Sequence, residues 1–326
     1  MERAQGLSFW QGGKVEIRPV NDVREELHLG EGRTNQNFIA TTDSARYFIR
    51  IGKDLPYFGV ARVREQAASR AAEVAGLAPV VAFTELPDVL VLKFVEGRAL
   101  TEDALHAAAA SSYQEPTLQA ITSAIRALHQ LPVPAELRAF AEEVSQGRPL
   151  GWGGPHLAKW LAYAEKEGYC RIPLLTGLRD TIAKLEAAAG PTGEEVFCHF
   201  DLLPDNLVMC QEGGVKLVDF EYSAPGQALM DLAVLAMGCS LSSEEEQNLL
   251  SSYLGALVTD EQHRAFKAVR VLAALRETFW GVTAELSKTS ALPIEEAKAY
   301  VDMNYAKFCQ LLGEFEASTA ASPSGK

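Results

Sequence analysis

The segment CHFDLLPDNLVMCQEGGVKLVDFEYS concentrates acidic and amide side chains in an otherwise apolar stretch. Asp201 and Asn206 stand five residues apart with Pro204 between them, and proline favours an ordered loop over a continuous helix. Asp219 follows a glycine-containing turn, so a strand–turn–strand unit would return it to the side of Asn206. A carboxylate and an amide oxygen together suit Mg²⁺, which prefers oxygen ligands. The segment therefore predicts a metal site, with Asp201 aimed at an acceptor hydroxyl.

The spacing H-F-D-x-x-x-x-N followed by D-F-E matches the phosphoryl-transfer pattern H-R-D-x-x-x-x-N and D-F-G of protein kinases. We therefore expect Asp201 to be catalytic and Asn206 and Asp219 to hold the metal that bridges nucleotide phosphates. His199 belongs to the same catalytic loop, and we expect it to orient the loop through a hydrogen bond. The alternative is a polar loop at the edge of a hairpin.

The elements that must position these residues divide the chain into two lobes. Residues 1–96 predict an N-lobe for the nucleotide, because short strand-like runs flank an Ala-rich helix over 61–76 that ends in glycine. Residues 97–316 predict a helical C-lobe with the catalytic loop and the acceptor site, since apolar residues recur there at helical spacing. Residues 317–326 are small and polar and are expected to be disordered.

These motifs together resemble the aminoglycoside phosphotransferase and choline/ethanolamine kinase superfamily, nearest the choline kinase branch. In that superfamily HxDLLPxN, (V/I)DFEY and a PxxDLA-like run recur in order, and here they read HFDLLPDN, VDFEY and APGQALMDLA. The resemblance covers nearly the whole chain and implies an α+β, protein-kinase-like fold with a small antiparallel-sheet N-lobe and a larger helical C-lobe. It places Glu221 and Tyr222 on the substrate side. It also implies that Asp231 braces the catalytic loop, although such an aspartate can simply cap a helix.

The nucleotide side is predicted by GEGRTNQNF, a turn whose backbone N–H groups and side chains could contact phosphates, through Gly30, Gly32, Thr34 and Asn35. Taken alone it could be a bare turn, but its position before YFIRI resembles the G-G-x-(S/T)-N loop of the superfamily. The adenine is expected against the backbone of Phe94, Val95 and Glu96, where the chain crosses between the lobes.

The resemblance assigns Arg50, on the strand after this loop, to the phosphates, where protein kinases use lysine. Arginine can bind phosphate oxygens in a bidentate way. A solvated charge at a strand edge is the alternative. The ion-pair partner of Arg50 is expected to be Glu65, with Glu73 in reserve.

The acceptor prediction depends on the run RETFWGVTAELSK. Glu277 and Trp280 are three residues apart and would share a helix face, and an aromatic ring beside a carboxylate suits a quaternary ammonium group. The resemblance to choline kinases adds a second aromatic wall, Tyr300 or Tyr305, from the following helix. Thr283 stands where eukaryotic choline kinases have a second tryptophan, so the cage is less aromatic. Ordinary helix-packing aromatics are the alternative.

Composition narrows the class of partner and the compartment. A net charge of −13 argues against nucleic acid and is compatible with a cationic small substrate. Five scattered cysteines without CxxC spacing predict reduced thiols in a cytoplasm. No run of about 18 apolar residues occurs, so no membrane span is expected.

We therefore expect an ATP- and Mg²⁺-dependent kinase for a small cationic amino-alcohol, with choline the first candidate and the oligomeric state unpredicted. Ethanolamine, thiamine or an aminoglycoside are alternative acceptors. A protein kinase is disfavoured, because APGQALMDLA follows DFE almost at once and leaves no activation loop. A catalytically inactive nucleotide-binding module is disfavoured by the intact Asp201, Asn206 and Asp219.

Overall fold

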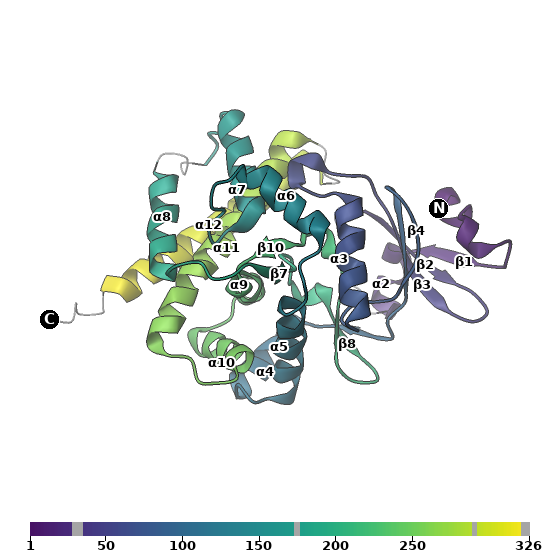
Figure 1. The fold of residues 1–326 in the computed structure, drawn as a ribbon, viewed down its shortest axis with the longest axis horizontal. Helices are drawn as coiled ribbons and strands as arrows, with labels where there is room; N and C mark the ends of the chain where they lie inside the picture. The colour runs from purple at the N-terminus through teal and green to yellow at the C-terminus, as the bar shows by residue number, and fades with distance from the viewer. Residues whose placement is uncertain (28–34, 173–176, 289–291, 321–326) are drawn as a thin grey trace.

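A five-stranded antiparallel sheet forms the N-terminal part of the structure, a computed structural model that describes residues 1–27, 35–172, 177–288 and 292–320 (Figure 1). Its strand order is β1-β2-β3-β5-β4. The strands are β1 (Glu16–Pro19), β2 (Gln36–Thr41), β3 (Arg46–Ile51), β4 (Val81–Glu85) and β5 (Val89–Lys93). The helices beside them are α1 (Glu2–Gln5), α2 (Val20–Leu27) and α3 (Arg62–Val74).

The alternation of side chains along β3 decides what each face of this sheet does. Ile49 is fully buried and packs with Val89 and Val91 on one face. Phe48 and Arg50, one residue to either side, point to the opposite face and line a cavity. Because strand side chains alternate with a period of two, the run YFIRI places its arginine in that cavity.

The second part of the chain is mostly helical and carries the larger core (Figure 1). Its helices are α4 (Glu102–Ser111), α5 (Pro116–His129), α6 (Ala135–Ser145), α7 (Gly154–Lys166), α8 (Leu178–Ala189), α9 (Ala228–Gly238), α10 (Ser243–Leu254), α11 (Asp260–Ser287) and α12 (Ile294–Ala320). Almost every side chain of α11 from residue 266 to residue 284 is buried, as in a helix that is covered on all sides.

Two small sheets hold the segment between α8 and α9. β7 (Val196–Cys198) pairs with β10 (Ala224–Gly226), and β8 (Leu207–Cys210) forms a hairpin with β9 (Val215–Leu217). The crossover strand β6 (Gly97–Ala99) pairs with β8 and so fixes the crossover between the lobes to the hairpin. Gly97 is required there, because a Cβ atom would lie 2.5 Å from the carbonyl oxygen of Met209.

The predicted fold class is confirmed, since a small antiparallel-sheet part is joined to a larger helical part. The expected disordered tail is wrong at its start, because α12 continues to Ala320. Ser318 and Thr319 donate hydroxyl hydrogen bonds to the carbonyls of Phe315 and Glu316 and so remain helical. Residues 321–326 lie outside the described residues. No helix in the described ranges is long and apolar enough to span a bilayer.

Candidate active site

The loop between β7 and β8 holds Asp201 and Asn206 together. The Nδ2 atom of Asn206 donates to the carbonyl oxygen of Asp201 at 2.8 Å and to its Oδ2 at 3.0 Å. A short 3₁₀ turn that begins at Pro204 makes this return possible. With Nδ2 used in this way, the oxygen Oδ1 is the atom of Asn206 that remains for a cation.

Asp231 in the first turn of α9 fixes the start of this loop. Its fully buried carboxylate accepts hydrogen bonds from the backbone N–H groups of His199 at 2.8 Å and Phe200 at 2.7 Å, and from Nε2 of His129 at 3.0 Å. Phe200 has a φ of 64°, a left-handed conformation that this brace stabilises. The N-cap of α9 is Gln227, so the carboxylate is a brace rather than a cap.

His199 holds the loop through hydrogen bonds of both ring nitrogens. Its Nε2 donates to the carbonyl of Val218 at 2.9 Å, and its Nδ1 accepts from the N–H of Asp201 at 3.3 Å. Burial lowers the pKa of His199 to about 4, so the ring is neutral near pH 7 with its proton on Nε2. Both nitrogens of this fully buried ring are therefore engaged with the backbone of the loop and of Val218.

The electrostatic state of Asp201 differs from that of an ordinary aspartate. Burial, followed by the negative charge of Glu277, raises its pKa to about 7, while the positive charge of Arg276 opposes the rise. A carboxylate with a pKa near 7 can accept a proton at neutral pH. Both Glu277 and Arg276 belong to α11, so Asp201 faces that helix.

Asp219, two residues after the end of β9, offers a carboxylate that could hold a metal ion. It has a φ of 64° and lines the same cavity as Asn206. Burial raises its pKa well above the usual range, and the charges of Glu221, Glu65 and Asp201 raise it further. A cation at this position would relieve that repulsion, and the oxygen donors of Asn206 and Asp219 fit Mg²⁺.

The cavity lined by Phe48 and Arg50 of β3, which we call the Arg50 cavity, has a volume of about 160 Å³. Its apolar lining comes from Val20, Phe48, Leu90, Leu92, Phe94 and Val208. The same cavity is also lined by Arg50, Asn206 and Asp219. A ligand that combines a flat apolar group with an anionic group would match this lining.

Arg50 is buried and pairs with Glu65, its Nη2 lying 2.9 Å from Oε2, so the partner is Glu65 and not Glu73. Within the described residues, its Nε and Nη1 are buried without an acceptor. Orphaned guanidinium donors at the wall of a cavity are suited to phosphate oxygens.

Arg62, at the start of α3, organises the acids around this end. Its Nη1 lies 2.9 Å from Glu65 and 2.8 Å from Glu221, and its Nη2 donates to Oδ1 of Asn35 at 2.5 Å. Burial opposes the charge of Arg62, but the two acids raise its pKa above the ordinary value. The side chain is fully buried and fixes α3 against the segment after β9.

The other residues predicted for the nucleotide side lie in the Arg50 cavity, at the surface, or outside the described residues. Asn35, Phe94 and Val95 line the Arg50 cavity. The side chain of Glu96 instead pairs with Arg46 at the surface, and its carbonyl accepts the N–H of Gln211 at 3.0 Å. Gly30, Gly32 and Thr34 lie outside the described residues.

An aromatic cluster lies on the α11 side of Asp201. The Trp280 ring is 5.0 Å from the Tyr300 ring, and its Nε1 donates to the hydroxyl of Tyr222 at 2.8 Å. Tyr300 donates its hydroxyl to Glu277 at 2.9 Å. Gly281 permits this close approach of α11 and α12, since a Cβ atom there would lie 3.0 Å from the Tyr300 ring.

Two residues predicted for the substrate side, Glu221 and Tyr305, make contacts outside the cluster of Trp280 and Tyr300. Glu221 faces α3 and pairs with Arg62, because the turn after Asp219 directs it toward the N-lobe. Tyr305 stacks on Phe308 of its own helix, with ring centroids 6.4 Å apart. Five residues after Tyr300, it is rotated about 140° around the helix axis and points away from Trp280.

Sequence reasoning missed Arg62, Arg276 and Phe58. Arg276 donates to Glu277 at 2.5 Å and lies over the rings of Trp160 and Tyr222. Phe58 forms the other side of the cluster, 5.4 Å from the Trp280 ring. The available signals were an arginine three residues before Glu65 and an arginine within the mostly apolar run of α11.

Comparisons with known proteins identify the family of this chain and structures that share its fold. A family model described as Phosphotransferase enzyme family matches residues 27–274. A search among curated proteins found no match.

Several solved structures share the fold. A choline/ethanolamine kinase family protein from Mesorhizobium loti has a TM-score of 0.63 at 20% identity, with 94% of this chain and 99% of that chain covered. The choline kinase of Streptococcus pneumoniae has a TM-score of 0.65 at 20% identity, with 90% and 97% covered. A spectinomycin phosphotransferase in complex with ADP has a TM-score of 0.56 at 12% identity, with 96% and 98% covered.

Proposed function

Because this chain belongs to the phosphotransferase enzyme family, we propose that it transfers the γ-phosphate of ATP to the hydroxyl of a small cationic amino-alcohol, with choline the first candidate. The observation that carries this proposal is the cavity in which Asn206, tied to Asp201 at 3.0 Å, shares a wall with Asp219 and with the orphaned donors of Arg50. This donor set matches what phosphoryl transfer requires.

In this proposal, Asn206 and Asp219 hold Mg²⁺, which neutralises negative charge on the nucleotide phosphates when it is bound. Arg50 binds phosphate oxygens through Nε and Nη1, while Glu65, itself paired with Arg62, keeps the Arg50 side chain in place. The adenine lies in the Arg50 cavity beside Phe94 and Val95.

Asp201 orients the acceptor hydroxyl and takes its proton. A pKa of about 7 leaves a substantial ionised fraction at neutral pH. Asp231 and His199 are positioning residues, because they reach the reaction only through the loop that carries Asp201. Since the transition state of this transfer is loose, fixed positions of these groups supply most of the catalysis.

The acceptor class is supported by the rings of Trp280 and Tyr300 beside Glu277, with the fully buried Phe58 packed against Trp280. Aromatic faces attract an ammonium group by roughly 0.5–2 kcal/mol each. Arg276 offsets the charge of Glu277, so attraction of the cation depends more on the rings than on this carboxylate. That favours a quaternary ammonium such as choline over ethanolamine or the several charged amines of an aminoglycoside.

ATP consumption tests the proposal with choline, ethanolamine, thiamine and an aminoglycoside as acceptors. We expect choline to stimulate the reaction most and Asp201→Ala to remove it while nucleotide binding persists. Asp219→Ala should weaken nucleotide binding only when Mg²⁺ is present. Stimulation by none of these acceptors would contradict the amino-alcohol assignment.

Two tyrosines of α12 provide a matched control for the acceptor site. Tyr300→Ala removes a ring that contacts Trp280 and should raise the KM for choline by about tenfold, as expected for one lost cation–π contact. Tyr305→Ala removes the same side chain away from the cluster and should leave the KM unchanged. Equal effects of the two substitutions would place the acceptor elsewhere.

A further inference from the structure

A second cavity lies in the helical part, between α9, α10, α11 and α12. Its volume is about 370 Å³, within the range of small-molecule sites. It shares no lining residue with the Arg50 cavity. Its cations are Lys267, Arg270 and Lys307, an unusual concentration in a chain with a net charge of −13. We call it the Arg270 cavity.

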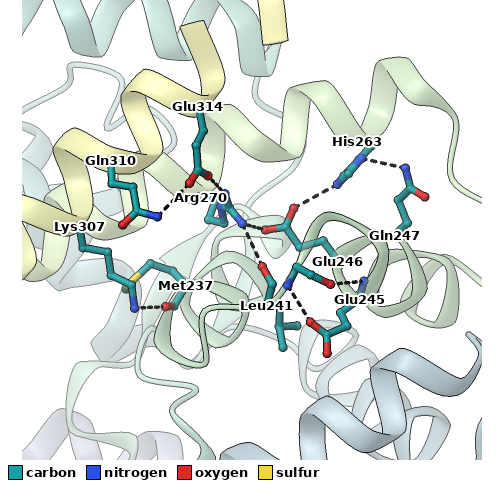
Figure 2. Close-up of polar contacts among 11 residues, drawn as sticks. Met237, Leu241, Glu245, Glu246, Gln247, His263, Arg270, Lys307, Gln310 and Glu314 are labelled. Atoms are coloured by element: carbon teal, nitrogen blue, oxygen red, sulfur yellow. Dashed lines mark hydrogen bonds and ion pairs between the residues drawn. The ribbon is translucent and has the colours of Figure 1, made fainter. Parts of the chain in front are cut away.

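The acids of the Arg270 cavity are already engaged by protein donors (Figure 2). Glu246 is fully buried and pairs with Arg270 through one oxygen and with Nε2 of His263 through the other, at 3.1 Å. Glu314 accepts from Nη2 of Arg270 at 3.1 Å and from Nε2 of Gln310 at 2.9 Å. Their charges offset two of the three cations, and each of their carboxylate oxygens already accepts from a protein donor.

The donors, in contrast, are in surplus. Arg270 is only 8% exposed, yet its Nε is buried without an acceptor in the described part of the chain. Lys307 donates to the carbonyl of Met237 at 2.6 Å, which leaves two of its three protons (Figure 2). Burial lowers the pKa of Lys307, and a bound anion would oppose this lowering because it favours the charged amine. Lys267 forms no ion pair with any described residue.

The N-terminus of α10 adds donors on another side. Ser242 caps this helix, and its hydroxyl oxygen accepts the N–H of Glu245 at 3.3 Å, so the hydroxyl hydrogen remains available. Ser243 is the first helical residue, and both serines line the cavity. The capping box engages the N–H groups of Ser242 and Glu245, which leaves those of the first two helical residues, Ser243 and Glu244, to favour an anion.

We propose that the Arg270 cavity binds the phosphate group of inorganic phosphate or of a small phosphate monoester. Surplus donors on three sides, with the acids already engaged, call for a ligand that carries several acceptor oxygens and negative charge. Leu311 and Phe315 line an apolar wall that gives room for the organic part of a monoester. This site is independent of the proposed reaction centre.

Calorimetric titration of the full chain with inorganic phosphate tests the proposal, with ADP present to fill the Arg50 cavity. We expect a dissociation constant at or below about 1 mM. Ser243→Asp places a negative charge in the site while remaining favourable at a helix N-terminus, and Lys267→Glu reverses an unpaired cation. Each should weaken phosphate binding by at least about tenfold.

The control is Lys14→Glu, which makes the same charge change as Lys267→Glu but at an exposed residue of the N-lobe. It should leave phosphate binding unchanged. Thermal melts confirm that the variants fold. Absence of phosphate binding, or binding that Ser243→Asp and Lys267→Glu leave intact, overturns the proposal. A parallel titration with phenyl phosphate separates the two sources: tighter binding than inorganic phosphate identifies a monoester site, and equal binding identifies a site for free phosphate.

Discussion

Replacing Asp201 with asparagine should stabilise the folded state at alkaline pH while it abolishes turnover. Burial and the charge of Glu277 raise the pKa of Asp201 from 3.8 to about 7. At about 1.36 kcal/mol per pKa unit, the ionised carboxylate costs the folded state about 4 kcal/mol relative to the unfolded chain. Asparagine carries no charge, and its amide oxygen can still accept the hydrogen bond from Nδ2 of Asn206.

The pH window of this effect follows from the direction of the pKa change. Below 3.8 the carboxyl of Asp201 is protonated in both states, so ionisation costs nothing. Between 3.8 and about 7 the unfolded chain ionises while the folded chain does not, and stability falls as the pH rises. Above about 7 the loss is complete. The stability advantage of Asp201→Asn should therefore grow with pH and then level off.

Urea unfolding of the parent and of Asp201→Asn, at pH values on both sides of 7 and without nucleotide, measures this difference. Asp205→Asn is the matched control, because Asp205 is an exposed carboxylate four residues further along the same loop. Its free energy of unfolding should follow that of the parent at every pH. A stability difference for Asp201→Asn that is constant with pH would refute a buried, charge-repelled carboxylate at this position.

Three further outcomes follow from the site. Below about pH 7, kcat/KM should fall about tenfold per pH unit as Asp201 becomes protonated, which a pH–rate profile checks. Asp231→Asn should lower the free energy of unfolding by about 2–4 kcal/mol, measured in urea, because an amide NH₂ would face a backbone N–H that now donates to an oxygen. Arg62→Met should cost about 3–5 kcal/mol in the same assay, because it leaves Glu65 and Glu221 buried together without their shared partner.

The parts of the fold that could be predicted from the sequence are those with a strong local period. The β8–β9 hairpin, the strand YFIRI and helices such as α3 and α11 each carry their pattern within one short segment. The helix α2 (Val20–Leu27) was missed, since its few apolar residues lie within a polar run. The pairing of β6 with β8 was also missed, because it joins residues more than a hundred positions apart.

The same distinction between local patterns and distant contacts applies to the candidate site. Asp201, Asn206 and Asp219 fall in one segment, and their spacing was enough to predict that they share a site. Arg62 meets Glu221 from 159 positions away, and Phe58 meets Trp280 across the two lobes. Contacts of that range depend on the complete fold. The pairing of Glu221 with Arg62 was not predicted, because the sequence does not show which way a side chain turns after Asp219.

The arginines around the candidate site separate its carboxylates into those with an arginine partner and those without one among the described residues. Glu65 and Glu221 share Arg62, and Glu277 is held by Arg276. Such pairing fixes an acid in place and engages its oxygens, which disfavours a role in proton transfer or metal binding.

Asp201 and Asp219 have no arginine partner among the described residues, although burial and neighbouring acids raise the pKa of both. Left unpaired, each keeps an oxygen for a group that comes from outside the chain. Under the proposed function, a divalent cation at Asp219 would relieve the repulsion among these acids, and the raised pKa of Asp201 would suit a general base. A structure that paired all of its buried acids would be more stable and would have nothing left to bind a metal or a hydroxyl.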